Sequence, residues 1–415
     1  MWFNVRFDGG RLELADKLNG LNACEMVEIA HPVPRVEPAS CFVAGGTPDF
    51  TGLQGYLYDT PLGLDAPAAW ALAGGRGERM KFIDIERNWF RQHEDFNQDT
   101  FFFANNVTNA GVSSNHGTAV LGEVIGADNG FGVTGFASDA LWGTVAYPTG
   151  DWPFVAEYFI EAAEALDAGD VWLIEIQMFP AGLGATPMEY LQSNFDAIWT
   201  SSFALEIICV EAGANGSQNL DGAAFGDRFN RNVRDSGAIL VAAGLPTSLT
   251  AEDFSNYGSR MDAHAWGSSI VTTGYGSLQG GATAELYADS FGGTSGASPM
   301  IVGEALCLQG ILKAAGRPVL TPIEIRQIIT ESGTPHTDSA RDIGPRGNIA
   351  AAIELLPLDC LLADLNSDGV VDLLDVAPFI DAIEAGEYVC EADINEDLSV
   401  NLLDVPALID LLNGD

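Results

Sequence analysis

The feature that most constrains the fold is an alternation of short apolar runs with helical segments through the middle of the chain. Residues 154–168 have helical periodicity, and residues 170–177 form a largely apolar run typical of a buried strand. A second helical stretch, residues 190–200, is followed by strand-like runs at residues 204–210 and 238–243. Strands separated by helices at this spacing predict an α/β fold, a parallel sheet covered by helices on both faces.

A glycine-rich turn near Ser295 leads into an apolar helix, predicted to run from Pro299 to about Ala315. Proline suits the first turn of a helix because its missing N–H would be unpaired there anyway. At a helix N-terminus, backbone N–H groups and the helix dipole favour a developing negative charge. Ser295 is therefore interpreted either as a nucleophile for acyl transfer or as a serine that merely caps the helix.

Two further stretches favour the nucleophile. Residues 80–85 are predicted to form a buried strand that ends near Asp84, and His116 opens an apolar helix. A serine hydroxyl needs a base to take its proton, and the base needs a carboxylate to fix its tautomer. Asp84, His116 and Ser295 are the candidates for these three roles.

These three residues occur in the order Asp, His, Ser along the chain, which is the order found in subtilisin. With the motifs around them, the chain resembles the subtilisin-like serine peptidases, the subtilases. The sequence His-Gly-Thr at residues 116–118 and the sequence Gly-Thr-Ser-Gly-Ala-Ser-Pro at residues 293–299 carry the resemblance. The resemblance covers residues 47–357 and implies a subtilisin-like sheet and a secreted serine endopeptidase that forms an acyl-enzyme. Residues 1–46 are then a remnant of an inhibitory pro-region or an N-terminal extension.

The resemblance also assigns roles to two loops that follow strands. It places Asn215 in the position of the side-chain amide that stabilises the tetrahedral intermediate, although asparagine is also common in exposed turns. It places Glu175, Ile176 and Gln177 on an edge strand that binds substrate in the specificity pocket. There the bulk of Gln177 and the charge of Glu175 would narrow the pocket or favour a basic group. Alternatively, Glu175 is turned away into a hydrogen-bond network.

Two departures from the family pattern keep a second interpretation open. Ile85 and Glu86 follow Asp84, where the family usually has Ser or Thr and then Gly. Ala214 precedes Asn215, where the family usually has Gly. The alternative is a catalytically degenerate fold that acts as a binding or anchoring component of an extracellular assembly.

The C-terminal part of the chain contains an acidic pattern in two copies. Oxygen-bearing side chains recur at loop positions 1, 3, 5, 9 and 12, and position 7 offers a backbone carbonyl, which is the arrangement of a calcium loop. The copies lead into apolar helices predicted over residues 373–383 and 402–412. The candidate metal ligands are Asp364, Asn366, Asp368, Val370, Asp372 and Asp375 in the first loop, and Asp393, Asn395, Asp397, Ser399, Asn401 and Asp404 in the second.

With aspartate at position 12, this pattern resembles the type I dockerin module, a duplicated calcium loop-helix that binds a cohesin. The resemblance implies a small α-helical domain over residues 358–415, Ca²⁺ as the cofactor, and a cohesin-like or surface anchoring partner. Leu398 stands where the second loop would have the glycine of its sharp turn. The pairs Leu373-Leu374 and Leu402-Leu403 are expected to face either that partner or the core of the domain.

The formal net charge of −40 limits the classes of partner. Such a surface repels nucleic acids and anionic membranes. The sequence contains no run of about 18 uncharged apolar residues, so no transmembrane helix is predicted. Protein or peptide substrates are the expected partners. The resemblance implies an extracellular or cell-surface location, although the start of this sequence has no signal-peptide pattern.

Overall fold

The computed structural model describes residues 46–150, 155–358, 362–366, 370–385, 389–395 and 400–413, together with Lys17, Leu21 and Asn22. Its contacts separate residues 1–46 from residues 47–415. The predicted pro-region therefore lies outside the described residues, apart from the three single residues and Gly46.

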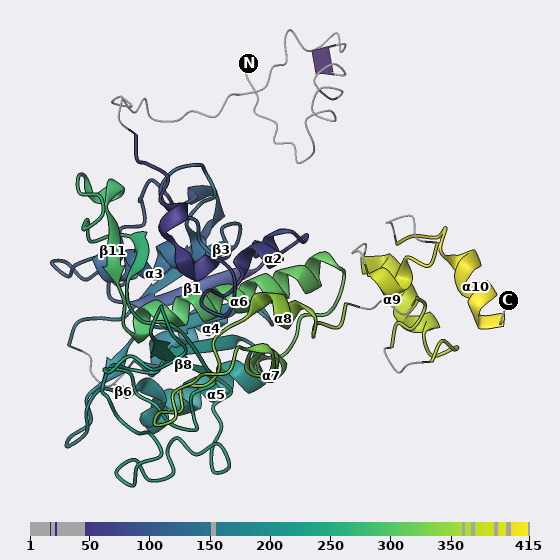
Figure 1. The fold of residues 1–415 in the computed structure, drawn as a ribbon. Helices are drawn as coiled ribbons and strands as arrows, with labels where there is room; N and C mark the ends of the chain where they lie inside the picture. Colours follow the sequence, from purple (N-terminus) through teal and green to yellow (C-terminus); the bar gives the residue numbers. More distant parts are fainter. Residues whose placement is uncertain are drawn as a thin grey trace. The chain divides into compact units, whose positions relative to one another are not determined.

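A seven-stranded sheet with the strand order β2-β3-β1-β4-β7-β8-β9 forms the centre of residues 47–358 (Figure 1). All its neighbouring strands pair in parallel. The strands are β1 Lys81–Glu86, β2 Phe101–Ala104, β3 Leu141–Ala146, β4 Val171–Ile174, β7 Ile208–Ala212, β8 Ile239–Gly244 and β9 Ala263–Trp266. The predicted parallel sheet is confirmed.

Helices cover both faces of the sheet, among them α3 (Asn115–Ile125), α4 (Ala156–Glu164), α5 (Gln192–Ala204) and α6 (Thr294–Ala314). One face packs against α3 and α6, and the other packs against α4 and α5. Successive side chains of β1 point to opposite faces of the sheet. Phe82 packs in the core with α3 and α6, whereas Ile83 and Ile85 pack in the core with α4 and α5. Asp84 and Glu86 therefore lie on the face that packs against α3 and α6.

Two predicted boundaries differ from the observed ones. The run at residues 204–210 begins as a strand only at Ile208, because α5 continues through Ala204. Helix α6 begins at Thr294, five residues before Pro299. Pro299 is thus an interior residue of the helix and cannot donate to the Ser295 carbonyl one turn earlier.

Further elements complete this part of the chain, and α9, η6 and α10 lie near the C-terminus. They are η1 Thr51–Leu53, η2 Gly55–Leu57, α2 Ala66–Trp70, η3 Gln98–Thr100, β5 Gln177–Met178, β6 Thr186–Pro187, η4 Met188–Tyr190, β10 Ile270–Thr273, η5 Thr283–Glu285, β11 Tyr287–Phe291, α7 Pro322–Ser332, α8 Ile349–Ile353, α9 Val376–Ala385, η6 Cys390–Ala392 and α10 Val405–Asn413.

The C-terminal region has a small core of its own. Phe379 of α9 and Leu408 of α10 are buried there with Ala363, Ala392 and Ile394. Both helices begin three residues later than predicted, because the residues before them still belong to turns. Within the described parts of the whole chain, no helix has the length and apolar character needed to cross a membrane.

Candidate active site

The carboxyl ends of the central strands bring the candidate site residues together. Strand β1 ends at Glu86, Glu175 directly follows β4, and Asn215 lies in the loop after β7. Carboxyl ends of parallel strands meet at one edge of a sheet, where open α/β sheets commonly bind ligands. Ser295 and His116 reach this edge from the first turns of α6 and α3.

Two glycines make the sharp turn from β11 into α6. Gly293 has φ +95°, a conformation that glycine adopts readily. A Cβ on Gly292 would lie 2.3 Å from the carbonyl oxygen of Gly267, so only glycine fits that close approach. Ser295 follows this turn within the first helical residues, where backbone N–H groups lack partners inside the helix.

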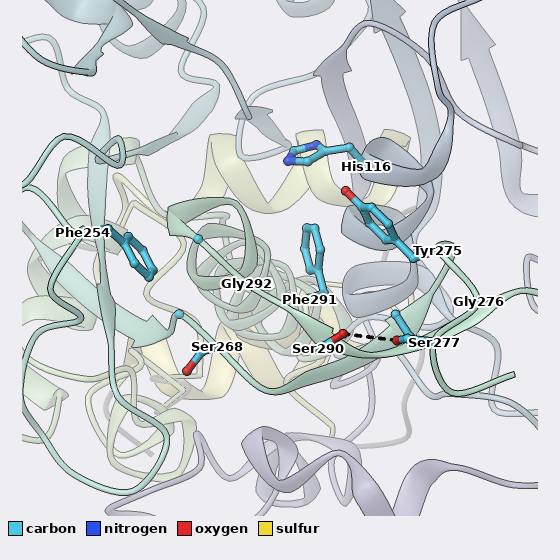
Figure 2. Close-up of a pocket in the computed structure, with 12 residues that line it drawn as sticks. His116, Phe254, Ser268, Tyr275, Gly276, Ser277, Ser290, Phe291 and Gly292 are labelled. Atoms are coloured by element: carbon cyan, nitrogen blue, oxygen red, sulfur yellow. Dashed lines mark hydrogen bonds between the residues drawn. The ribbon is translucent and has the colours of Figure 1, made fainter.

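His116 is partly exposed at the start of α3. Its Nδ1 is hydrogen-bonded to a carboxylate oxygen of Glu86, and its ring lies edge-on to Phe291, with ring centroids 5.5 Å apart. Beside it is an open cleft of about 720 Å³, which Tyr275, Phe291 and the turn at residues 292–293 help to line (Figure 2). The glycine turn before Ser295 and the His116 imidazole thus border the same cleft.

The carboxylate that faces His116 is Glu86 and not Asp84, which corrects the predicted contact. Asp84 is fully buried, and its Oδ2 accepts a hydrogen bond of 2.6 Å from Trp89 Nε1. The Trp89 ring packs beneath the start of α3, where a Cβ on Gly117 would lie 2.5 Å from it. Because Asp84 and Glu86 are two residues apart on one strand face, both point toward α3, and Glu86 at the strand end reaches the imidazole.

Electrostatics separates the two carboxyl groups further. Burial is the main reason that the pKa of Asp84 lies well above its usual value, and the negative charge of Glu86 adds a smaller increase. Although burial opposes a charged imidazole, the charge and hydrogen bond of Glu86 raise the pKa of His116 to about 9. A neutral Asp84 behind a Glu86–His116 pair is the arrangement that these shifts favour.

Asn215 is hydrogen-bonded through its side-chain oxygen to the residue before Ser295. Asn215 Oδ1 accepts hydrogen bonds from the backbone N–H of Thr294, at 2.9 Å, and from Thr294 Oγ1, at 3.2 Å. The backbone N–H of Asn215 donates to Gln177 Oε1 at 2.9 Å. Since the oxygen is committed as an acceptor, the amide nitrogen is the end that can donate at the turn.

The departure at Ala214 has a backbone explanation. Ala214 has φ +68°, in the left-handed region that the glycine usual at this position in the family would adopt without steric strain. An alanine can adopt this conformation at a cost of about 1–2 kcal/mol. The loop therefore keeps the shape that presents Asn215.

The three residues predicted to line a specificity pocket have different surroundings. Glu175 is buried, and its Oε1 is hydrogen-bonded to Ser298 Oγ. Ile176 is buried in the core on the α4 and α5 side, and Gln177 supports Asn215 from β5. The hydrogen-bond network that the sequence left open for Glu175 is therefore present.

Sequence reasoning missed Glu86, Trp89, Thr294 and Ser298. The departure at residues 85–86 was a visible signal for Glu86, since a second carboxylate two residues after Asp84 lies on the same strand face. No local pattern marked the other three, because their roles depend on segments far apart in the chain.

The acidic C-terminal loops repeat the same hydrogen bonds. Asp375 is fully buried, and its two oxygens accept the backbone N–H groups of Asn366, at 3.0 Å, and Asp372, at 2.9 Å. Asp404 is also fully buried and accepts equivalent bonds from Asn395, at 3.1 Å, and Asn401, at 2.9 Å. Each position-12 carboxylate thus fixes the shape of its own loop.

The described donors in these loops fit calcium by type. They are carboxylate and amide oxygens, and carboxylate oxygens keep further lone pairs when they accept one N–H each. The predicted ligands Asp368, Asp397 and Ser399 lie outside the described residues. Within the described residues alone, no three or more His, Cys, Asp or Glu side chains form a group that could hold a metal ion.

The comparisons with known proteins agree on the fold. The subtilase family matches residues 80–345, and the dockerin type I domain matches residues 362–413. A protease from Pseudoalteromonas arctica PAMC 21717 is 22% identical over 74% of this chain and 99% of its own, with a TM-score of 0.54. The MycP3 protease from the type VII (ESX-3) secretion system is 17% identical over 77% of this chain and 98% of its own, with a TM-score of 0.53. No curated protein matches the sequence.

Proposed function

From the premise that this chain belongs to the subtilase family and carries a dockerin type I domain, we propose that it is a secreted serine endopeptidase with a Ser295–His116–Glu86 triad. The observation that carries this assignment is the hydrogen bond between His116 Nδ1 and Glu86, at the strand edge where Ser295 also lies. It replaces the aspartate predicted from the sequence with a glutamate two residues later.

In this mechanism Ser295 Oγ attacks the peptide carbonyl carbon while His116 takes the hydroxyl proton through its Nε2. Glu86 holds the imidazole through Nδ1 and stabilises the imidazolium that forms. The Asn215 amide and the Ser295 backbone N–H donate to the oxyanion. His116 then gives the proton to the leaving amine, and water hydrolyses the acyl-enzyme by the same route.

The cleft beside His116 supports binding of an extended peptide. It is open to solvent and borders the glycine turn before Ser295, and its wall includes the aromatic rings of Phe254, Tyr275 and Phe291. The two departures from the family pattern, at residues 85–86 and at Ala214, are compatible with this mechanism. Glu86 can supply the carboxylate, and Ala214 adopts the positive φ of the glycine that it replaces.

Labelling with a fluorophosphonate probe tests the peptidase assignment without knowledge of the substrate. We expect one adduct per chain, mapped to Ser295 by peptide mass, and none in a Ser295→Ala variant. Ser298→Ala is the matched control, since it removes a hydroxyl one turn along the same helix and should still be labelled at Ser295. Absence of an adduct on well-folded wild type at every pH would reject the proposal.

The C-terminal region is proposed to bind calcium and to anchor the enzyme to a cohesin-like partner. The residues that would hold calcium are those predicted in the two loops, with Asp375 and Asp404 closing each loop. The pairs Leu373-Leu374 and Leu402-Leu403 are exposed at equivalent positions, each just before a helix, which favours the partner over the domain's own core. An anchoring module of this kind suits a location outside the cell or at its surface.

Calorimetric titration of the full chain with Ca²⁺ tests this second part. We expect binding that is weakened by Asp375→Ala or Asp404→Ala singly and lost in the double variant, with fluorophosphonate labelling retained. Asp410→Ala, on α10 beyond the loops, is the matched control and should bind as wild type does. Full calcium binding by the double variant would reject these ligands.

A further inference from the structure

A second carboxyl group reaches the nucleophile from the strand next to β1. Glu175 is 7% exposed, and Ser298 Oγ is hydrogen-bonded to its Oε1. Ser295, one turn earlier on α6, also acts on this carboxyl group and lowers its pKa. Within the described part of the chain, Glu175 Oε2 has no hydrogen-bond partner. The triad does not account for this group.

The hydrogen bonds around Ser298 indicate where a proton lies. Ser298 Oγ donates to the carbonyl oxygen of Thr294 at 2.6 Å, and that carbonyl can only accept. A hydroxyl has one hydrogen, so the contact between Ser298 Oγ and Glu175 is best satisfied when the carboxyl group carries a proton and donates it. Geometry therefore favours a neutral Glu175.

Burial favours the same state and outweighs the charged groups around Glu175, of which His116 acts most strongly and lowers the pKa of Glu175. Glu86 acts on it from β1, and His116 and Glu123 act from α3. Asp84, also on β1, is raised in pKa partly by Glu175. The neighbouring strand β7 carries Glu211, whose carboxyl group interacts instead with Glu189 and Arg260. Among the groups that act most strongly on Glu175, only His116 can be cationic.

We propose that Glu175 is a further catalytic residue of this site, which keeps its proton in the active enzyme and whose ionisation stops attack by Ser295. An ionised Glu175 would accept the Ser295 hydroxyl hydrogen that must pass to His116. It would also place a negative charge beside Ser295 Oγ, which becomes bonded to the carbon that carries the developing oxyanion. This inference rests on the proposed peptidase function and deepens it.

Glu175 and His116 influence each other's ionisation. The two limbs of a pH–rate profile therefore report apparent pKa values of the pair and not of either residue alone. Burial raises the pKa of Glu175 to about 8, and Glu86 chiefly overcomes burial to raise the pKa of His116 to about 9. The active species holds a single proton on Glu175 and none on His116, and it is the less populated of the two singly protonated forms because Glu175 has the lower pKa. The rate of reaction should rise and then fall with increasing pH.

The test is the second-order rate of inactivation by a fluorophosphonate, measured against pH for wild type and Glu175→Gln. We expect a bell-shaped profile for wild type that falls about tenfold per pH unit beyond its maximum. Glu175→Gln should lose the alkaline fall and reach a plateau. Its rising limb should stay in place, because Glu175 is already neutral there and Gln removes no charge beside His116.

Glu304→Gln is the matched control. Glu304 lies on the same helix as Ser295, is fully buried, and has its pKa raised by burial to about 8, but it bonds the backbone N–H of Asn348. Its variant should keep the bell-shaped profile, which would exclude a general effect of buried carboxyl groups. If Glu175→Gln does not fold, as judged by circular dichroism, Glu175→Met supplies a second neutral side chain of similar length.

An unchanged alkaline limb in a folded neutral variant would overturn the role of Glu175. Complete loss of labelling in that variant would also overturn it, because the reaction would then require the charged form. Failure of wild type to react at any pH has a different meaning, since it would reject the proposed peptidase function itself.

Discussion

Replacing Glu86 with Gln is the perturbation that most directly tests the assignment of the triad. The rise of the His116 pKa from 6.5 to about 9 corresponds to about 3 kcal/mol in favour of the protonated ring, and Glu86 is the chief cause that raises it. Because 37% of the His116 side chain reaches solvent, screening reduces this to about 1–2 kcal/mol. We therefore expect the acid limb of the inactivation profile to move to lower pH by about one unit in Glu86→Gln.

The maximal rate should also fall, by about 10³- to 10⁴-fold, because the imidazole loses the group that fixes its tautomer and stabilises its charged form. Asp84→Asn is the matched control on the same strand face. Its side-chain oxygen can still accept from Trp89, so we expect a loss of less than about tenfold. The assignment would be wrong if Asp84→Asn lowered the maximal rate more than Glu86→Gln did and the acid limb of Glu86→Gln did not shift. Asp84 would then be the carboxylate that orients His116.

Two further predictions concern stability. The pKa of Glu304 is raised on folding, so its contribution is present below about pH 4.5 and is lost as pH rises toward about 8. Urea unfolding should therefore show wild type losing a few kcal/mol relative to Glu304→Gln across that range, and parallel curves would contradict the assignment. Ala214→Gly should raise the free energy of unfolding by about 1 kcal/mol by relieving the positive φ. It should leave labelling intact, because Gln177 and Thr294 still hold Asn215, and a fall in stability would show that the loop is not strained.

The local sequence was sufficient for much of the architecture. The alternation of apolar runs and helical segments predicted the parallel sheet, because each run buries its side chains only when helices cover both faces. The glycine turn before Ser295 and the start of the His116 helix were also visible, since backbone geometry restricts which residues fit there. The duplicated acidic loops were recognised because ligand spacing is a property of a single short segment.

The choice between Asp84 and Glu86 could not be made from the sequence. Two residues apart on a strand, they share a face, so periodicity treats them alike. Packing decides between them: the Trp89 ring against Gly117 takes Asp84 as its acceptor, and the strand end leaves Glu86 beside His116. The contacts of Glu175 with Ser298 and Ser295 are likewise tertiary, because they join β4 to α6 across more than a hundred residues. Sequence determined which kinds of group this protein brings to its candidate active site, and only the folded structure decided that Glu86 faces His116 and that Glu175 faces the first turn of α6.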